Sequence, residues 1–151
     1  MLNQGQDFVF DLDTIDMVHK CLDKIEATEG AAVLITISTS QKRFSTGFSL
    51  PFWQEDKTHA FKSIATMQGL LARFIKIAMP SMCVITGHAY AGGLILALCH
   101  DFRVMRTDSG KLCLSEINVG IPIPPAYNEI CKHFMPRQIY REMVMGRAIT
   151  S

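Results

Sequence analysis

Two short apolar runs are the clearest elements in the sequence. "EGAAVLITIS" (29–38) and "SMCVIT" (81–86) are rich in β-branched residues, and turn residues lie beside them. Continuous apolar runs of this length are typical of strands that are buried on both faces of a parallel sheet. We therefore expect residues 32–37 and 83–86 to be neighbouring strands of one parallel sheet, joined by a helical crossover.

The long stretch between these runs has a helical pattern. Over residues 58–78 apolar side chains recur at the 3.6-residue spacing of an α-helix, and Pro80 follows its end. The apolar positions are Phe61, Ile64, Ala65, Leu71, Ala72, Ile75 and Ala78. A first helix is also predicted near the N-terminus, with Asp13 as its N-terminal cap. Its apolar face comprises Ile15, Val18, Leu22 and Ile25.

The rest of the chain continues the alternation of strands and helices. Residues 39–53, "TSQKRFSTGFSLPFW", read as a loop, and Gly92 begins a helix that covers residues 92–99. Short strands are expected at 102–107 and 111–115, followed by helices at 125–134 and 136–145. This order predicts an α/β fold with right-handed crossovers, in a single domain over residues 1–151.

Composition excludes several classes of function. The chain has 151 residues and a formal net charge of +1, so it carries no basic surplus that would indicate a nucleic-acid partner. No apolar stretch approaches the ~20 residues of a membrane span. The five cysteines are widely spaced within apolar or helical patterns, which favours buried free thiols over disulfides or a metal site. They are Cys21, Cys83, Cys99, Cys113 and Cys131.

A glycine pair, Gly92 and Gly93, stands where a strand gives way to a helix. The first N–H groups of a helix have no internal acceptor, and a glycine there lets a ligand oxygen approach closely. A second glycine, Gly47, lies in the earlier loop, so N–H groups from two loops can converge as an oxyanion hole. Close packing of helix on strand is the alternative reading. A nucleotide site is disfavoured, since neither common phosphate-loop motif is present.

Three segments in order resemble the signatures of the crotonase family, the enoyl-CoA hydratases and isomerases. They are "AAVLITISTSQKRFSTGFSL" (31–50), "PSMCVITGHAYAGGLILALCHDFRVM" (80–105) and "LCLSEINVGIPIPP" (112–125). The resemblance implies the crotonase-like core, a spiral of ββα units. It also implies an acyl-CoA thioester as the substrate, with no separate cofactor and no metal.

The resemblance also assigns site residues. The family's two oxyanion-hole amides, which hold the thioester carbonyl, fall on Phe48 and Gly92. Ser49 replaces the usual aspartate, and Ala91 replaces the first of three glycines, but neither change removes a backbone N–H. The substrate-binding residues implied are Ser45, Gly47, Phe48, Ser49, Leu50 and Gly92.

The chemistry within the family depends on two carboxylates. Hydratases use two glutamates to add water, and the first of these positions is occupied here by Ile95. The second is Glu116, which lies between apolar residues, so burial should raise its pKa and make it a better base. One carboxylate without the other resembles the Δ3,Δ2-enoyl-CoA isomerase branch. Without the resemblance, Glu116 would read as a solvated loop carboxylate.

The chain is short for this family. Members begin with an extra strand pair, which is absent here or only hinted at in "DFVFDL" (7–12). They continue beyond the position of Ser151 with helices that close the acyl site and build a trimer. A truncated form, a short isoform or a subunit that has lost catalysis would explain this. We therefore expect an incomplete core that forms a trimer-based homo-oligomer or joins an assembly. A non-catalytic interaction subunit is the alternative function. The resemblance implies an intracellular protein of the peroxisome or the mitochondrion.

Overall fold

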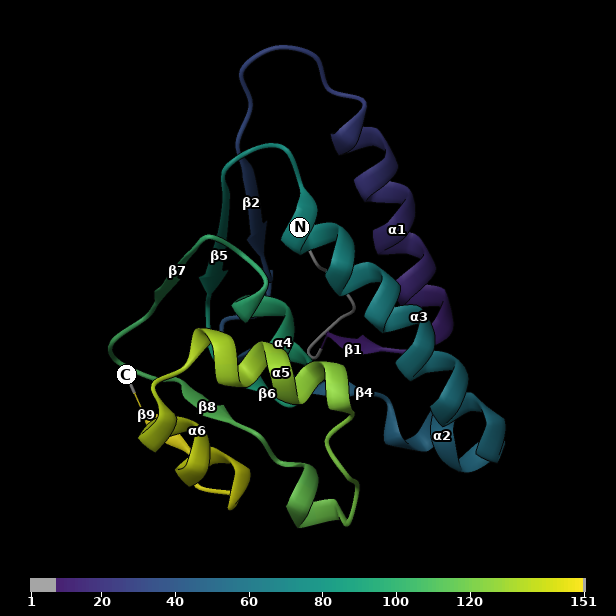
Figure 1. The fold of residues 1–151 in the computed structure, drawn as a ribbon, viewed down its shortest axis with the longest axis vertical. Coiled ribbons are helices and arrows are strands. Elements are labelled where there is room, and N and C mark those ends of the chain that lie inside the picture. Colours follow the sequence, from purple (N-terminus) through teal and green to yellow (C-terminus); the bar gives the residue numbers. More distant parts are fainter. Residues whose placement is uncertain (1–7, 151) are drawn as a thin grey trace.

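The computed structural model describes residues 8–150. Strands and helices alternate along the chain as the sequence predicts (Figure 1). Their order is β1 (Val9–Phe10), α1 (Leu12–Glu26), β2 (Leu34–Ile37), β3 (Arg43–Ser45), β4 (Gly47–Phe48), α2 (Leu50–Glu55), α3 (Lys57–Lys76), β5 (Ser81–Ile85), β6 (His88–Tyr90), α4 (Gly92–Leu98), β7 (Phe102–Met105), β8 (Lys111–Cys113), the 3₁₀ helix η1 (Glu116–Val119), α5 (Pro125–Phe134), α6 (Arg137–Val144) and β9 (Ile149–Thr150).

The strands form two main sheets and one separate pair. The order β2-β5-β7 forms one sheet, the order β3-β6-β8-β9 forms the other, and β1 pairs with β4. All pairings are parallel except β8 with β9. The chain passes directly from the first sheet to the second three times, at β2–β3, β5–β6 and β7–β8, and helices connect the successive passes. This is the spiral of ββα units that the sequence led us to expect.

The predicted neighbouring strands are confirmed. β2 pairs with β5 in parallel register, Leu34 opposite Ser81 and Ile37 opposite Val84. The stretches at 102–107 and 111–115 also form strands, but β7 and β8 lie in different sheets. "DFVFDL" contains β1, which lies against β4 and thereby supports the segment that carries Phe48.

The expectation that these strands are buried on both faces is wrong. Along β2, Leu34 is buried whereas Ile35 is 57% exposed. Helices α1, α3 and α4 all lie on one side of the β2-β5-β7 sheet (Figure 1), so the other face has no cover from the described part of the chain. An apolar run shows that a strand has two apolar faces and says nothing of what covers each of them. The exposed apolar residues of this outer face are Val33, Ile35, Phe102 and Val104.

The N-terminal cap of helix α1 lies two residues earlier than predicted. Asp11 is the N-terminal cap, and its carboxylate accepts the N–H of Thr14 at 2.8 Å. A capping side chain must precede the first turn to reach the N–H groups there, and Asp13 already lies within that turn. The predicted face is confirmed for Ile15, Val18 and Leu22, which are buried.

Helix α3 has the expected length, but its predicted apolar face is confirmed only in part. Leu71 is buried as predicted, whereas Ala72 and Ile75 are exposed. Phe61 is 78% exposed, whereas Met67 and Leu70 are fully buried. The helix carries two apolar stripes, and periodicity alone does not choose between them. The predicted loop at 39–53 was also wrong, because it contains β3, β4 and α2. Those strands are too short to show a period in the sequence.

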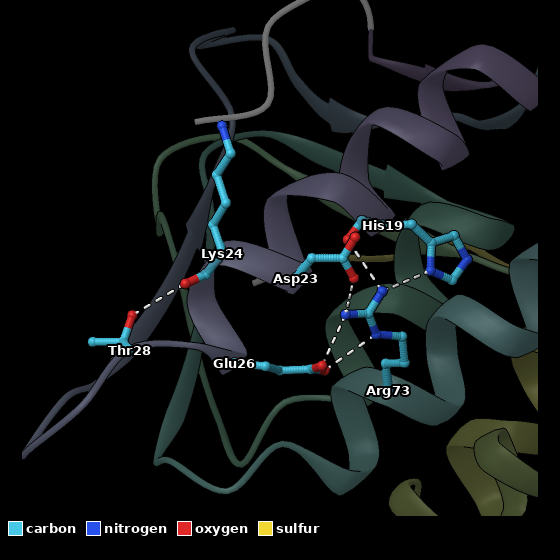
Figure 2. A network of polar contacts seen from close by, with 6 residues as sticks. All are labelled: His19, Asp23, Lys24, Glu26, Thr28 and Arg73. Atoms are coloured by element: carbon cyan, nitrogen blue, oxygen red, sulfur yellow. Dashed lines mark hydrogen bonds and ion pairs between the residues drawn. The ribbon is translucent and has the colours of Figure 1, made fainter.

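Arg73 on α3 joins this helix to α1 through a polar network (Figure 2). Its guanidinium donates to both carboxylate oxygens of Glu26 and to Asp23, at 2.8 to 3.1 Å. It also meets the ring Nδ1 and the backbone carbonyl of His19 at 3.0 and 3.1 Å. The guanidinium of Arg73 therefore binds three residues of α1 at once.

Replacing Arg73 should loosen the contact between α1 and α3. We expect Arg73→Ala to lower the free energy of unfolding by about 1–2 kcal/mol, because several charge-assisted bonds are lost at a partly exposed site. Urea denaturation followed by circular dichroism measures this. Lys20→Ala is the control, since it breaks only the exposed pair with Asp16. Equal effects of the two substitutions would contradict the structural role of Arg73.

Candidate active site

A cavity of about 440 Å³ opens beside the β1–β4 pair. Its walls come from β4, α2, α3, α5 and the segment around η1. Most of the lining is apolar. Among the lining residues within 8–150, Glu116 is the only acid or base that is charged at neutral pH in its ordinary state. The space suits an apolar group with one reactive carboxylate beside it.

The loop that ends at β4 touches the beginning of α4. Gly47 has φ +87°, a conformation that L side chains rarely adopt. A Cβ atom on Gly47 would lie only 2.9 Å from the backbone nitrogen of Gly92. Glycine at position 47 is therefore required twice, by the turn and by the close approach of two backbone segments.

The two glycines of the pair have different surroundings. A Cβ atom on Gly93 would lie 2.6 Å from both the Cβ and the carbonyl oxygen of Ser45, so close packing explains Gly93. A Cβ atom on Gly92 would make only ordinary contacts, the nearest at 3.5 Å to the Cα of Gly47. Packing within the described chain therefore does not require glycine at position 92.

Ala91, just before α4, has an unusual backbone conformation. Its φ of +47° and ψ of −124° are rare for a residue with a Cβ atom. Its N–H donates to the carbonyl of Cys113 at 2.9 Å, and its own carbonyl accepts the N–H of Ile95 at 3.1 Å. These bonds fix the peptide that carries the Gly92 N–H. The family signature has a glycine at this position, which agrees with the backbone conformation that Ala91 adopts.

Phe48 is surrounded by aromatic rings. The ring centroids of Trp53, Tyr127 and Phe10 lie 4.8, 6.3 and 6.4 Å from that of Phe48, and Tyr127 is stacked nearly parallel to it. Phe48, Trp53 and Tyr127 all line the cavity. Sequence reasoning missed Tyr127, whose position on a helix far along the chain gave no signal of a role in the site.

Glu116 is buried at the start of η1. It is 8% exposed, and its Oε2 atom has no hydrogen-bond partner among the described residues. Burial raises the pKa of this carboxyl above its ordinary value. The same surroundings raise the pKa of the Tyr127 hydroxyl. Glu116 is therefore not the solvated loop carboxylate that its sequence context alone suggested.

The other predicted site residues divide into two groups. Ser49 and Leu50 line the cavity together with Phe48 and Glu116. Ser45, Gly47 and Gly92 are buried, and they lie beside this lining rather than in it. Ile95, at the position of the first hydratase glutamate, is fully buried within α4.

The cysteines are free thiols, four of them buried. The expectation of burial is wrong for Cys21, which is exposed on α1. Burial raises the pKa of Cys99 and of Cys131 to about 12. Residues 8–150 contain no group of three or more metal-ligating side chains. In the same part of the chain no helix combines the length and apolar character needed to span a bilayer.

A sequence model of the family described as "Enoyl-CoA hydratase/isomerase" matches residues 8–151. The chain therefore belongs to this family, the crotonase family that its three signatures resemble. It is 37% identical to enoyl-CoA delta isomerase 3 of Arabidopsis thaliana over 127 residues, which are 80% of this chain and 52% of that protein. It is 30% identical to the peroxisomal enoyl-CoA delta isomerase 2 of the same plant over 129 residues, 82% of this chain and 54% of that one. The chain thus spans about half the length of these relatives.

Solved structures share the fold. A probable enoyl-CoA hydratase from Mycobacterium tuberculosis superposes with a TM-score of 0.91 at 22% identity, over 99% of this chain and 63% of that one. An enoyl-CoA hydratase from Geobacillus kaustophilus superposes with a TM-score of 0.89 at 22% identity, over 98% of this chain and 57% of that one. These structures confirm the crotonase-like core over nearly all of the chain.

Removing the Cβ atom of Ala91 should relieve strain. We expect Ala91→Gly to raise the free energy of unfolding by about 1 kcal/mol, because the folded backbone there suits glycine. Thermal or urea unfolding measures the change. Ala72→Gly, on the exposed side of α3, should instead lower stability by about 1 kcal/mol. Destabilisation by both substitutions would show that the Ala91 backbone is not strained.

Proposed function

We propose that the protein is an enoyl-CoA isomerase that moves the double bond of a 3-enoyl-CoA to the 2-trans position. The observation that carries the proposal is Glu116, a buried carboxylate alone in an apolar cavity. Several relatives are isomerases by name, which supports the same reaction. An acyl-CoA thioester is then the substrate, and the reaction needs no cofactor.

In this proposal Glu116 acts as both base and acid. Its carboxylate takes a proton from C2 of the 3-enoyl-CoA, and the electron pair moves to the thioester oxygen to form a conjugated enolate. Glu116 then returns the proton at C4, where the electron pair of the C3–C4 double bond forms the new C–H bond. The C1–C2 electron pair of the enolate moves to form the C2–C3 double bond, and the oxygen electron pair restores the carbonyl. A carboxyl group with a raised pKa suits both steps better than a fully solvated one.

The N–H groups of Phe48 and Gly92 would hold the enolate oxygen. Adjacent N–H groups of an extended strand point in opposite directions. Because the Ser49 N–H donates to the carbonyl of Phe10 at 3.0 Å, the Phe48 N–H is directed away from β1. The Gly92 N–H opens α4 and has no intrahelical acceptor. Packing does not require glycine at position 92. The close approach of the enolate oxygen would explain why glycine is found there.

Water addition is disfavoured at the same site. Hydration requires a positioned water molecule and a second group to transfer its proton. Ile95 offers no such group, and among the described residues that line the cavity Glu116 is the only carboxylate. An isomerase therefore explains an isoleucine at position 95 beside a glutamate at position 116 better than a hydratase does.

A non-catalytic interaction subunit is the second candidate function. It is favoured by the uncovered outer face of the β2-β5-β7 sheet, because parallel sheets are normally covered on both faces. The four exposed side chains of this face are all apolar, so the patch is complementary to a second copy of itself. We propose that this face mediates homo-oligomerisation, which is compatible with either function.

We also propose a peroxisomal location, from the relatives alone. Two of the plant isomerases are peroxisomal by name, at 30% and 32% identity. Of the two organelles that the family resemblance implies, these names favour the peroxisome.

Replacing Glu116 by glutamine tests the proposed base. Glu116→Gln keeps the shape of the side chain but removes its proton-accepting group, so the isomerisation rate should fall by roughly 100- to 10,000-fold. The conversion of a 3-enoyl-CoA is followed by the absorbance of the conjugated product. Wild-type activity should rise with pH through the raised pKa of Glu116, because only the carboxylate form accepts the C2 proton.

Binding provides the control for this variant. Trp53 is the only tryptophan of the chain and lines the cavity, so its fluorescence reports an acyl-CoA that enters. Glu116→Gln should bind a saturated acyl-CoA as well as the wild type does, because the amides that hold the thioester are backbone groups. An unchanged rate in Glu116→Gln would rule out this base, and a wild type that binds acyl-CoA without converting it would favour the interaction subunit.

A charge on the outer sheet face tests self-association. Sedimentation should show the wild-type chain as a species larger than a monomer, and Ile35→Lys should shift it to the monomer. Phe61→Lys, at another exposed apolar position, should leave association intact. A wild type that is monomeric at all concentrations would refute oligomerisation through this face.

A further inference from the structure

Ser45 contacts both segments that supply the proposed oxyanion amides. It is the last residue of β3 and is fully buried, with an exposed fraction of 0%. Its Oγ atom accepts the N–H of Gly47 at 3.2 Å, and this bond closes the turn that leads into Phe48. Its Cβ and carbonyl oxygen lie against Gly93, where even a single added carbon atom would lie 2.6 Å from each.

We propose that Ser45 is a positioning residue that sets the Phe48 and Gly92 amides relative to each other, and that it does not itself contact the substrate. The proposal rests on the proposed isomerase function. It assigns Ser45 a role different from the CoA contact that the family resemblance implies. The Ser45 side chain is fully buried, and its Oγ atom already accepts the N–H of Gly47, so the hydroxyl is engaged within the protein.

The physical reason lies in the freedom of Gly47. A glycine at φ +87° has many other accessible conformations. The Ser45 Oγ removes that freedom by binding the N–H of Gly47, and the contact with Gly93 fixes how far the turn lies from α4. Without the hydroxyl, the Gly47 N–H loses its acceptor and the Phe48 N–H shifts. Small displacements of catalytic groups have large effects on rate.

The chain offers a matched control in Ser38. Its Oγ accepts the N–H of Ser40, two residues on, also at 3.2 Å, and donates to the carbonyl of Arg43 at 3.3 Å, and the residue is 3% exposed. Ser38 follows β2 and is not part of the cavity lining. Ser38→Ala and Ser45→Ala therefore each remove a hydroxyl that accepts a backbone N–H within a turn, from a similarly buried position.

The test compares kcat, KM and acyl-CoA binding in the full chain. Ser45→Ala should lower kcat for a 3-enoyl-CoA by roughly 10- to 100-fold. This loss is smaller than the loss of kcat on removing an oxyanion donor, because the donor is displaced and not removed. KM and the binding of octanoyl-CoA, read from Trp53 fluorescence, should stay close to the wild type. Ser38→Ala should leave kcat unchanged, although it loses comparable stability. If Ser45→Ala fails to fold, Ser45→Cys keeps a weak acceptor and should show a smaller loss of kcat.

The outcomes separate this inference from the function on which it rests. A wild type that converts no 3-enoyl-CoA overturns both. An active wild type with unchanged kcat in Ser45→Ala overturns the positioning role alone. Equal losses of kcat in Ser45→Ala and Ser38→Ala would also overturn it, because the effect would then follow stability. Weaker octanoyl-CoA binding with unchanged kcat would instead restore Ser45 as a substrate contact.

Discussion

The contact between Gly47 and Gly92 is the constraint on which the site depends. Two backbone segments from different turns of the spiral approach so closely that a Cβ atom on Gly47 would lie 2.9 Å from the Gly92 nitrogen. The parallel pairing of β3 with β6 brings these segments together, and the strained peptide at Ala91 turns the chain into α4 at the point of contact. A larger residue at position 47 would separate the segments and displace both amides.

The acidity of the proposed substrate depends on this contact. A proton next to a thioester is too weakly acidic for a carboxylate to remove unless the developing charge on oxygen is stabilised. In the proposed function the backbone N–H groups of Phe48 and Gly92 would provide that stabilisation, which is stronger in an apolar environment than in water. Burial of Glu116 also favours the proton transfer, because it raises the pKa of the base toward the pKa of the C2–H group that must lose its proton.

The sequence predicted the strands and helices that have a long or strongly apolar pattern. It failed to predict which faces of these elements are buried, because tertiary contacts decide that. The parallel pairing of β2 with β5 and the span of α5 followed from apolar runs and helix signals. The buried stripe of α3, and the bare outer face at Ile35, depend on what packs there, which no local pattern records. Within the site, Glu116 and the glycines carried a family signature. Tyr127 did not, because it comes from a distant helix. The positive φ of Ala91 could be anticipated only from the glycine that the family signature has there, since alanine itself rarely adopts it.

The most direct test of the central claim is the fate of the substrate's atoms when a 3-enoyl-CoA is converted in water enriched in deuterium and oxygen-18. The account predicts a 2-trans-enoyl-CoA without oxygen-18, and with less than one deuterium at C4, because one shielded carboxylate carries the proton from C2 to C4. Mass spectrometry of the product measures both labels. A 3-hydroxyacyl-CoA that contains oxygen-18 as the main product would contradict the account, since it would show that the site activates water without a second carboxylate.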